Sequence, residues 1–177
     1  IRDNMGHLLT SESVTSGHPD KLCDFISDSI LDKCLSLDPN SRVAIEVFVK
    51  GLDHSNNNRA QSFIIIGGEI TMKENFAIDF EKIARKCAEQ IGYTDMEVGM
   101  DATNITRCEV QVLISQQSEE ISKGVLNSKN GVNEQGAGDQ GIIYGYASDE
   151  SEGYELTKGA YMPLPILLAH KLTLEIK

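Results

Sequence analysis

Residues 42–50 read Arg42-Val43-Ala44-Ile45-Glu46-Val47-Phe48-Val49-Lys50, and the alternation of their side chains predicts a β-strand. Successive side chains of a strand point to opposite faces, so the odd-numbered apolar residues share one face. Before this stretch, residues 19–37 carry apolar side chains at helical spacing. After it, residues 63–71 and 107–115 predict two more strands, with a helix over residues 79–91 between them. The order helix, strand, strand, helix, strand predicts an α/β (α+β) sandwich with helices on one face of a sheet.

The composition excludes several classes of protein. With 16 basic and 27 acidic residues among 177, the formal net charge is −11, which argues against a nucleic-acid surface. The apolar runs are too short to cross a bilayer, and no signal peptide is visible at the start. The four cysteines form no CxxC pair, so we expect small buried side chains and a reducing, cytoplasmic setting. The chain starts on isoleucine and stops inside a helical pattern, which indicates a piece of a longer protein.

Two segments over a hundred residues apart could bind phosphate. The first, Gly17-His18-Pro19-Asp20-Lys21, opens a predicted helix, and the second, Gly136-Ala137-Gly138-Asp139-Gln140-Gly141, is a glycine-dense loop with one acid. Backbone can approach phosphate closely at such places, and an acid there can hold the accompanying metal. Two plainer alternatives stay open: His18 as an exposed or capping residue, and Asp20 as a favourable first-turn acid. The glycine loop by itself completes neither a dinucleotide fingerprint nor a P-loop.

Three further acids are candidates. Glu12 lies just upstream and could join Asp20 in a metal site, or it could simply be solvated. Glu46 is the lone charge within an apolar strand, where a buried carboxylate would need a cation or hydrogen bonds; an exposed face of an edge strand is equally consistent. Glu69 follows two glycines, which mark either a bulge or a close backbone approach that could admit a ligand.

Polar segments separate these elements. Residues 51–61 are rich in asparagine and predict an exposed loop. Residues 116–135 are polar with little periodicity, and so long a stretch without structure is often a functional lid. Beyond it, residues 142–147 predict a short strand, and a final helix starts at about Ile166.

Several motifs follow one another in a fixed order along the chain. They are Thr10-Ser11-Glu12-Ser13-Val14, residues 17–21, Gly67-Gly68-Glu69-Ile70-Thr71, and residues 136–141 with Gly145-Tyr146-Ala147. In this order the chain resembles the S-adenosylmethionine synthetases from about Leu8 to Leu172. The resemblance implies repeated β-α-β-β-α-β-type domains, truncated here. It places an N-terminal synthetase domain over residues 1–115, a mobile active-site loop over 116–135 and the start of the central domain over 136–177.

The resemblance also implies the activity, that of a methionine adenosyltransferase. Such an enzyme joins ATP and L-methionine by attack of the methionine sulfur on C5′, and then hydrolyses the tripolyphosphate to phosphate and pyrophosphate. The family uses Mg²⁺ and K⁺, and its subunits form homodimers or dimers of dimers with active sites built between subunits. No nucleic acid or membrane partner is implied.

The motifs that resemble those of the family also imply which residues form the site. His18 and Lys21 match catalytic positions, and His18 and Asp139 match positions that contact ATP. Glu12 and Asp20 match acids associated with Mg²⁺, and Glu46 matches the one associated with K⁺. Glu69 and Gln117 match positions that contact methionine.

Two departures from the family pattern matter. The loop over residues 51–61 is longer than usual between these strands. The family's later segments, which supply further lysines, an arginine and a third domain, are not found in the 177 residues, so this chain alone should be inactive. The alternative hypothesis is therefore a non-catalytic module for nucleotide binding or subunit assembly.

Overall fold

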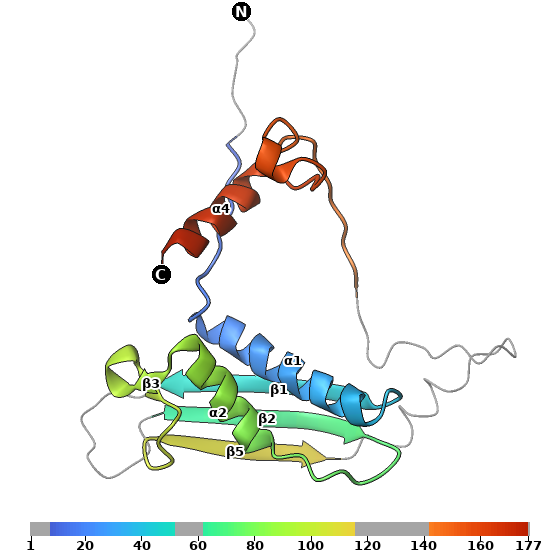
Figure 1. Ribbon diagram of the computed structural model, residues 1–177, viewed down its shortest axis with the longest axis vertical. Coiled ribbons are helices and arrows are strands. Elements are labelled where there is room, and N and C mark those ends of the chain that lie inside the picture. The colour runs from blue at the N-terminus through green and yellow to red at the C-terminus, as the bar shows by residue number, and fades with distance from the viewer. Residues whose placement is uncertain (1–7, 52–61, 116–141, 177) are drawn as a thin grey trace, which may run out of the picture. The chain divides into compact units, whose positions relative to one another are not determined.

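The computed structural model describes residues 8–51, 62–115 and 142–176 (Figure 1). By its contacts the chain divides into two units, residues 16–141 and residues 1–15 with 142–177. In the first unit the elements are α1 (Pro19–Leu37), β1 (Arg42–Gly51), β2 (Ser62–Thr71), α2 (Phe80–Ile91), β3 (Thr94–Asp95), η1 (Met96–Val98), β4 (Met100–Asp101) and β5 (Cys108–Ser115). The second unit holds η2 (Glu155–Thr157) and α4 (Leu164–Glu175).

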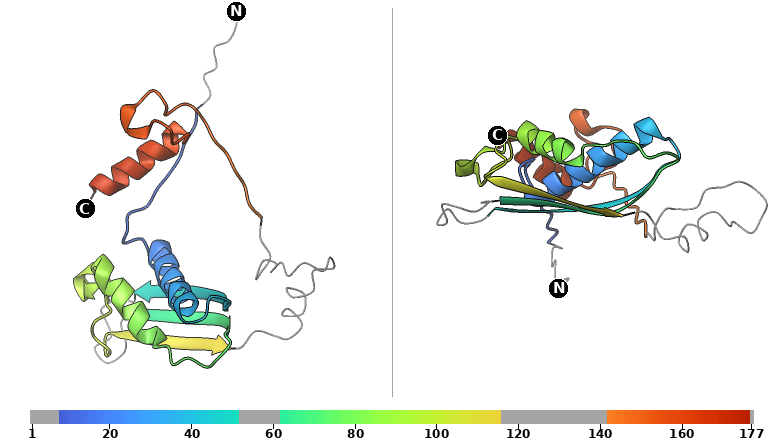
Figure 2. Two further views of the ribbon diagram at one scale, coloured as in Figure 1. Left: turned by 45° about the vertical axis from the view of Figure 1, so that its right-hand side comes forward. Right: turned by 90° about the horizontal axis from the view of Figure 1, so that it is seen from below.

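The first unit is a three-stranded sheet in the order β1-β2-β5. β1 and β2 are antiparallel, whereas β5 returns parallel to β2 after the crossover through α2. The right-hand view of Figure 2 shows α1 and α2 on the same side of this sheet. The predicted order of elements and the helices on one sheet face are both confirmed.

The core lies between the two helices and the sheet. α1 buries one residue per turn, and β2 and α2 supply the facing side chains: Leu22, Ile26, Ile30, Cys34, Ile64, Ile66, Ala84, Cys87 and Ala88. The predicted alternation of β1 is confirmed, because Val43, Ile45, Val47 and Val49 all pack against this core. Three of the four free cysteines are buried and Cys23 is half-buried, close to the prediction. Burial raises the pKa of the Cys34 and Cys108 thiols, as expected for unreactive structural cysteines.

The opposite face of the sheet carries a second apolar surface. Phe48 pairs with Ile65 across β1 and β2, and Ile65 pairs with Gln111 of β5. Phe48 is 58% exposed and Leu113 of the same face is 64% exposed. Within the described residues of this unit, no helix lies on this face (Figure 2). We call it the open face.

Gly68 explains the glycine pair of β2. Its φ is +136°, and a Cβ there would lie 2.0 Å from the carbonyl oxygen of Ala44. The register is unbroken at this point, with Ile45 opposite Gly68 and Glu46 opposite Gly67. Of the two sequence readings, close backbone approach is therefore confirmed, and a bulge is absent from this pair of strands.

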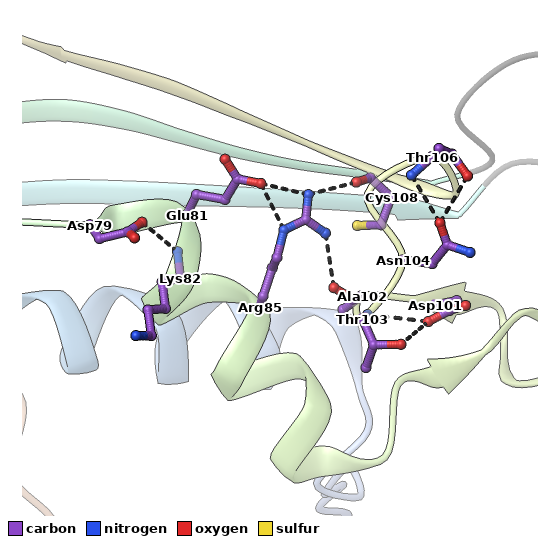
Figure 3. Close-up of polar contacts among 10 residues, drawn as sticks. All are labelled: Asp79, Glu81, Lys82, Arg85, Asp101, Ala102, Thr103, Asn104, Thr106 and Cys108. Carbon is purple, nitrogen blue, oxygen red and sulfur yellow. Dashed lines mark hydrogen bonds and ion pairs between the residues drawn. The ribbon is translucent and has the colours of Figure 1, made fainter.

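Two charged side chains tie the elements together. The Asp38 carboxylate, at the end of α1, accepts the backbone N–H of Asn40 at 3.0 Å and that of Lys73 at 2.7 Å, and these hydrogen bonds lower its pKa. Figure 3 shows Arg85 of α2 held by Glu81 while it donates to the carbonyls of Ala102 at 2.8 Å and Cys108 at 2.9 Å. Arg85 thereby fixes α2 to the chain that enters β5.

The second unit differs from its prediction at one point. The strand predicted over residues 142–147 is wrong, because these residues have no regular structure and Ile143 is 98% exposed. A strand needs a neighbour for its N–H and C=O groups, and no described segment pairs with it. The predicted final helix is confirmed as α4, two residues earlier than expected. Among the described residues, no helix is long and apolar enough to cross a membrane.

Candidate functional site

His18 caps the start of α1. Its Nδ1 accepts the backbone N–H of Asp20 at 3.1 Å, and Pro19 follows as the first helical residue. The Asp20 carboxylate lies 3.9 Å from the same nitrogen, an ion pair only if the ring is protonated. The shorter contact uses Nδ1 as an acceptor, which corresponds to the tautomer with its proton on Nε2. The capping alternative is therefore what the structure shows, and Nε2 makes no hydrogen bond with the described part of the chain.

Tyr93 holds the residue before His18. Its hydroxyl donates to the carbonyl of Gly17, and burial raises its pKa. Tyr93 directly follows Gly92, the left-handed residue that ends α2. Tyr93 is not among the site residues expected from the sequence, although an aromatic hydroxyl directly after a helix-ending glycine was an available signal. The helix start is thus anchored to α2 as well as to its own first turn.

Asp20 and Lys21 lie in the exposed first turn of α1. The Asp20 side chain is 89% exposed and that of His18 is 38% exposed. The positive end of the helix dipole favours an anion at this place, although the backbone N–H groups of Asp20 and Leu22 are already bonded to His18 and Pro19 has none. The helix start therefore carries a carboxylate, an ammonium and an imidazole within four consecutive residues, His18 to Lys21.

Glu46 and Glu69 meet on the open face. Glu46 lies opposite Gly67, and Glu69 lies opposite Ala44, so the two acids are diagonal neighbours on adjacent strands. Both line an open pocket of about 560 Å³ with Ala44, Ile45, Gly67 and Gly68. Glu46 is exposed, so the alternative of an exposed strand face holds and burial does not force a cation on it. Two carboxylates in one pocket still make it attractive to a cation or an ammonium group.

The remaining predicted residues are not all described. Glu12 is exposed and belongs to the unit of residues 8–15 and 142–176, whereas His18 belongs to the other unit. Gln117, Asp139 and the predicted loop over residues 116–135 lie outside the described residues, as do residues 52–61 of the long loop.

The oxygen-bearing side chains fit Mg²⁺ and K⁺, the two cations that the family resemblance implies, in part. Among the described residues, no group of three or more His, Cys, Asp or Glu side chains could hold a metal ion. Mg²⁺ at phosphate sites often takes only one or two carboxylates, with phosphate oxygens and waters completing its shell, so exposed Asp20 fits that role. Hard cations take carboxylate and carbonyl oxygens, which the pocket of Glu46 can offer.

Comparisons with known proteins agree with the motif order. Residues 6–119 match the family model described as the S-adenosylmethionine synthetase N-terminal domain, and residues 134–177 match that of the central domain. Over 172 residues the chain is 44% identical to the S-adenosylmethionine synthase of Brachyspira hyodysenteriae (strain ATCC 49526 / WA1). This match covers 94% of the present chain and 38% of the relative.

A second relative is equally similar. S-adenosylmethionine synthase 1 of Rhodopseudomonas palustris (strain BisB18) is 44% identical over 170 residues, covering 96% of this chain and 38% of the relative. The chain thus spans well under half the length of both relatives. A family model that matches most of the chain, together with identity at this level, shows the family: the chain belongs to the S-adenosylmethionine synthetases.

Proposed function

We propose that this chain acts as the N-terminal part of a methionine adenosyltransferase. The sulfur lone pair of L-methionine forms a bond to C5′ of ATP as the C5′–O5′ bond breaks, and that electron pair leaves on the triphosphate. The triphosphate is then hydrolysed to phosphate and pyrophosphate. Family membership supports the reaction, and the observation that carries the proposal here is His18, whose Nδ1 caps an anion-favouring helix start.

His18 acts on the leaving oxygen in this proposal. Its Nε2–H is a fixed donor, because Nδ1 is committed to the Asp20 backbone N–H. A preorganised donor gains most where negative charge develops, and that charge appears on O5′ only as the bond to C5′ breaks. His18 therefore favours the transition state over bound ATP.

The first turn of α1 receives the phosphates. Lys21 supplies a positive charge, and the positive end of the α1 dipole adds to it. Asp20 would hold Mg²⁺ there, with Glu12 as a second candidate ligand and Asp139 on the nucleotide side. When bound, Mg²⁺ would neutralise charge on the leaving triphosphate.

The pocket on the open face receives methionine in this proposal. Glu69 holds the ammonium group, which directs the sulfur along one line toward C5′, and positioning of this kind carries much of the rate of a substitution. Glu46 lies next to it and would take K⁺, with Gln117 as a further methionine contact from the predicted loop. A K⁺ ion at Glu46 would offset the second negative charge beside Glu69.

The open face also supports pairing of subunits. Phe48 and Leu113 are largely exposed on it, and apolar side chains gathered on one sheet face favour association with another protein surface. We propose a second copy as that partner, in a homodimer or a dimer of dimers. A cytoplasmic location and the domain limits at residues 115 and 136 stay predictions from the sequence.

The test is a pair of substitutions in the protein as its gene encodes it, assayed with ATP and methionine. Glu69→Gln should raise KM for methionine roughly tenfold or more, because a charge-assisted hydrogen bond is lost, and leave the K⁺ response intact. Glu46→Gln should blunt activation by K⁺ and change KM for methionine less.

Glu109→Gln is the matched control, since Glu109 lies on the same face, outside the pocket, and accepts from Gln111 at 2.7 Å. An unchanged KM in Glu69→Gln would remove Glu69 from the methionine site. Absence of S-adenosylmethionine formation by the unmutated protein would reject the proposed function itself.

A further inference from the structure

The segment that carries Glu12 has no regular structure. Residues 8–15 form neither helix nor strand, and they make no backbone–backbone hydrogen bond with the described residues. A segment without a hydrogen-bonded ladder depends on side chains for its position. In Figure 1 it runs past α4 within the same unit.

Ser13 links this segment to α4. Its Oγ lies 2.8 Å from Nδ1 of His170 and 3.4 Å from Oγ1 of Thr173. The two partners are 157 and 160 residues away in sequence. The Ser13 hydroxyl thus joins two parts of the chain that are remote from each other in sequence.

The contact with His170 is the stronger of the two that Ser13 makes. Ser13 Oγ and His170 Nδ1 share a hydrogen bond at 2.8 Å, and the tautomer of the ring decides which of them donates. The Thr173 hydroxyl donates to the carbonyl of His170 at 3.0 Å, and its 3.4 Å separation from Ser13 Oγ makes that contact weak.

Exposure separates the cluster from its neighbours. Ser13, His170 and Thr173 are half-buried, whereas Ser11, Glu12 and Lys171 are exposed. The segment therefore turns Ser13 toward α4 while the adjacent Glu12 remains open to solvent. Fixing Ser13 limits the positions that the next residue's carboxylate can reach.

We infer that Ser13 and His170 are positioning residues that hold Glu12 in place through the contact of residues 8–15 with α4. His170 touches no reacting atom in this account and acts through Ser13 alone. The inference rests on the proposed function only in giving Glu12 a role in the site. The contact itself stands on its geometry.

The first test measures limited proteolysis within residues 8–15 by a dilute non-specific protease, with the cut sites read by mass spectrometry, in the protein as its gene encodes it. Ser13→Ala and His170→Leu should each speed cleavage there roughly three- to tenfold, the change that one hydrogen bond supports. His170→Asn should restore slow cleavage, because its amide can both donate and accept in place of Nδ1. Ser11→Ala and Lys171→Ala are matched exposed controls and should leave the cleavage rate as it is.

Two results would overturn the contact. One is a cleavage rate within residues 8–15 of Ser13→Ala equal to that of the unmutated protein. The other is equal acceleration by Ser13→Ala and Ser11→Ala, which would show that His170 is irrelevant to the segment.

The second test measures kcat and the Mg²⁺ concentration that gives half-maximal activity. Ser13→Ala and His170→Leu should lower kcat roughly three- to tenfold and raise the Mg²⁺ requirement, with KM for methionine little changed. His170→Asn should recover both values. Faster cleavage with unchanged kinetics would overturn the positioning role.

Glu12→Gln separates this failure from that of the proposed function. Full activity in Glu12→Gln would reject the role of Glu12, and the cleavage result would then decide the contact alone.

Discussion

Different interactions stabilise the two units of the chain, residues 16–115 and residues 8–15 with 142–176. The first unit encloses a core of twelve buried apolar residues, from Leu22 to Cys108. In the second unit Ser151 is the one buried residue among those described, and α4 buries none of its side chains. There the order comes from polar contacts, in which Glu152 accepts the backbone N–H groups of Gly159 at 2.7 Å and Tyr161 at 2.9 Å.

This difference in packing determines which residues of the proposed site are held rigidly. His18 belongs to the unit with the core, and its backbone is fixed by α1 and by Tyr93. Glu12 belongs to the other unit, where one serine supplies the polar link to α4. Packed apolar interiors resist displacement more than a few exposed hydrogen bonds do. We therefore expect changes in the first unit to affect folding, and changes in the second to affect local position.

The largest effect should come from matched leucine truncations. Leu22 is fully buried in α1, and Leu172 of α4 is 66% exposed. Leu22→Ala should lower the free energy of unfolding by about 2–5 kcal/mol through lost burial and a cavity. Leu172→Ala should change it by about 0.5 kcal/mol or less. Urea unfolding followed by circular dichroism measures both, and similar losses would show that the two units share one core.

A smaller effect is expected from Tyr93→Phe. The variant loses the hydrogen bond to Gly17 and should lower stability by about 1 kcal/mol and kcat by roughly three- to tenfold, because His18 loses its support. Tyr154→Phe is the matched control in the second unit, with a side chain that is 56% exposed. A normal kcat in Tyr93→Phe would show that α1 alone fixes His18.

The smallest effect should be an acid response. Hydrogen bonds from backbone N–H groups lower the pKa of Asp38 in the first unit and of Glu152 in the second. A lowered pKa in the folded state gives stability that is present above the unfolded pKa of about 4 and is lost as pH falls through the folded value.

The two carboxylates can be separated by their amide variants. Asp38→Asn should flatten the fall in unfolding free energy below about pH 4, measured by urea titration at several pH values. Glu152→Gln should instead flatten the acid dependence of hydrogen exchange at residues 159–161. A global effect of Glu152→Gln equal to that of Asp38→Asn would contradict the separation of the two units.

Local signals predicted most of the first unit. α1 begins and ends as predicted because Pro19 favours a first turn and Asp38-Pro39 stops a helix. The alternation of β1 predicted its two faces, but the pairing of Glu46 with Gly67 depends on the register between strands. The neighbourhood of Glu46 and Glu69 therefore could not be predicted from either strand alone.

The contacts that the sequence pattern did not predict join residues that are far apart in the chain. The Tyr93 contact with Gly17 joins residues 76 apart, and the Ser13 contact with His170 joins residues 157 apart. Neither leaves a periodic pattern. The strand predicted at 142–147 failed for the related reason that pairing decides a strand, and its apolar run has no described neighbour.

In the proposed mechanism His18 assists the leaving oxygen, and one pair of variants at this position tests that role. His18→Ala removes both the cap and the imidazole, whereas His18→Asn keeps an acceptor for the start of α1. We predict that kcat falls roughly 10²- to 10³-fold in both variants while the Kd of ATP changes little. Equal losses in kcat and ATP affinity, or near-normal kcat in His18→Asn, would contradict the account.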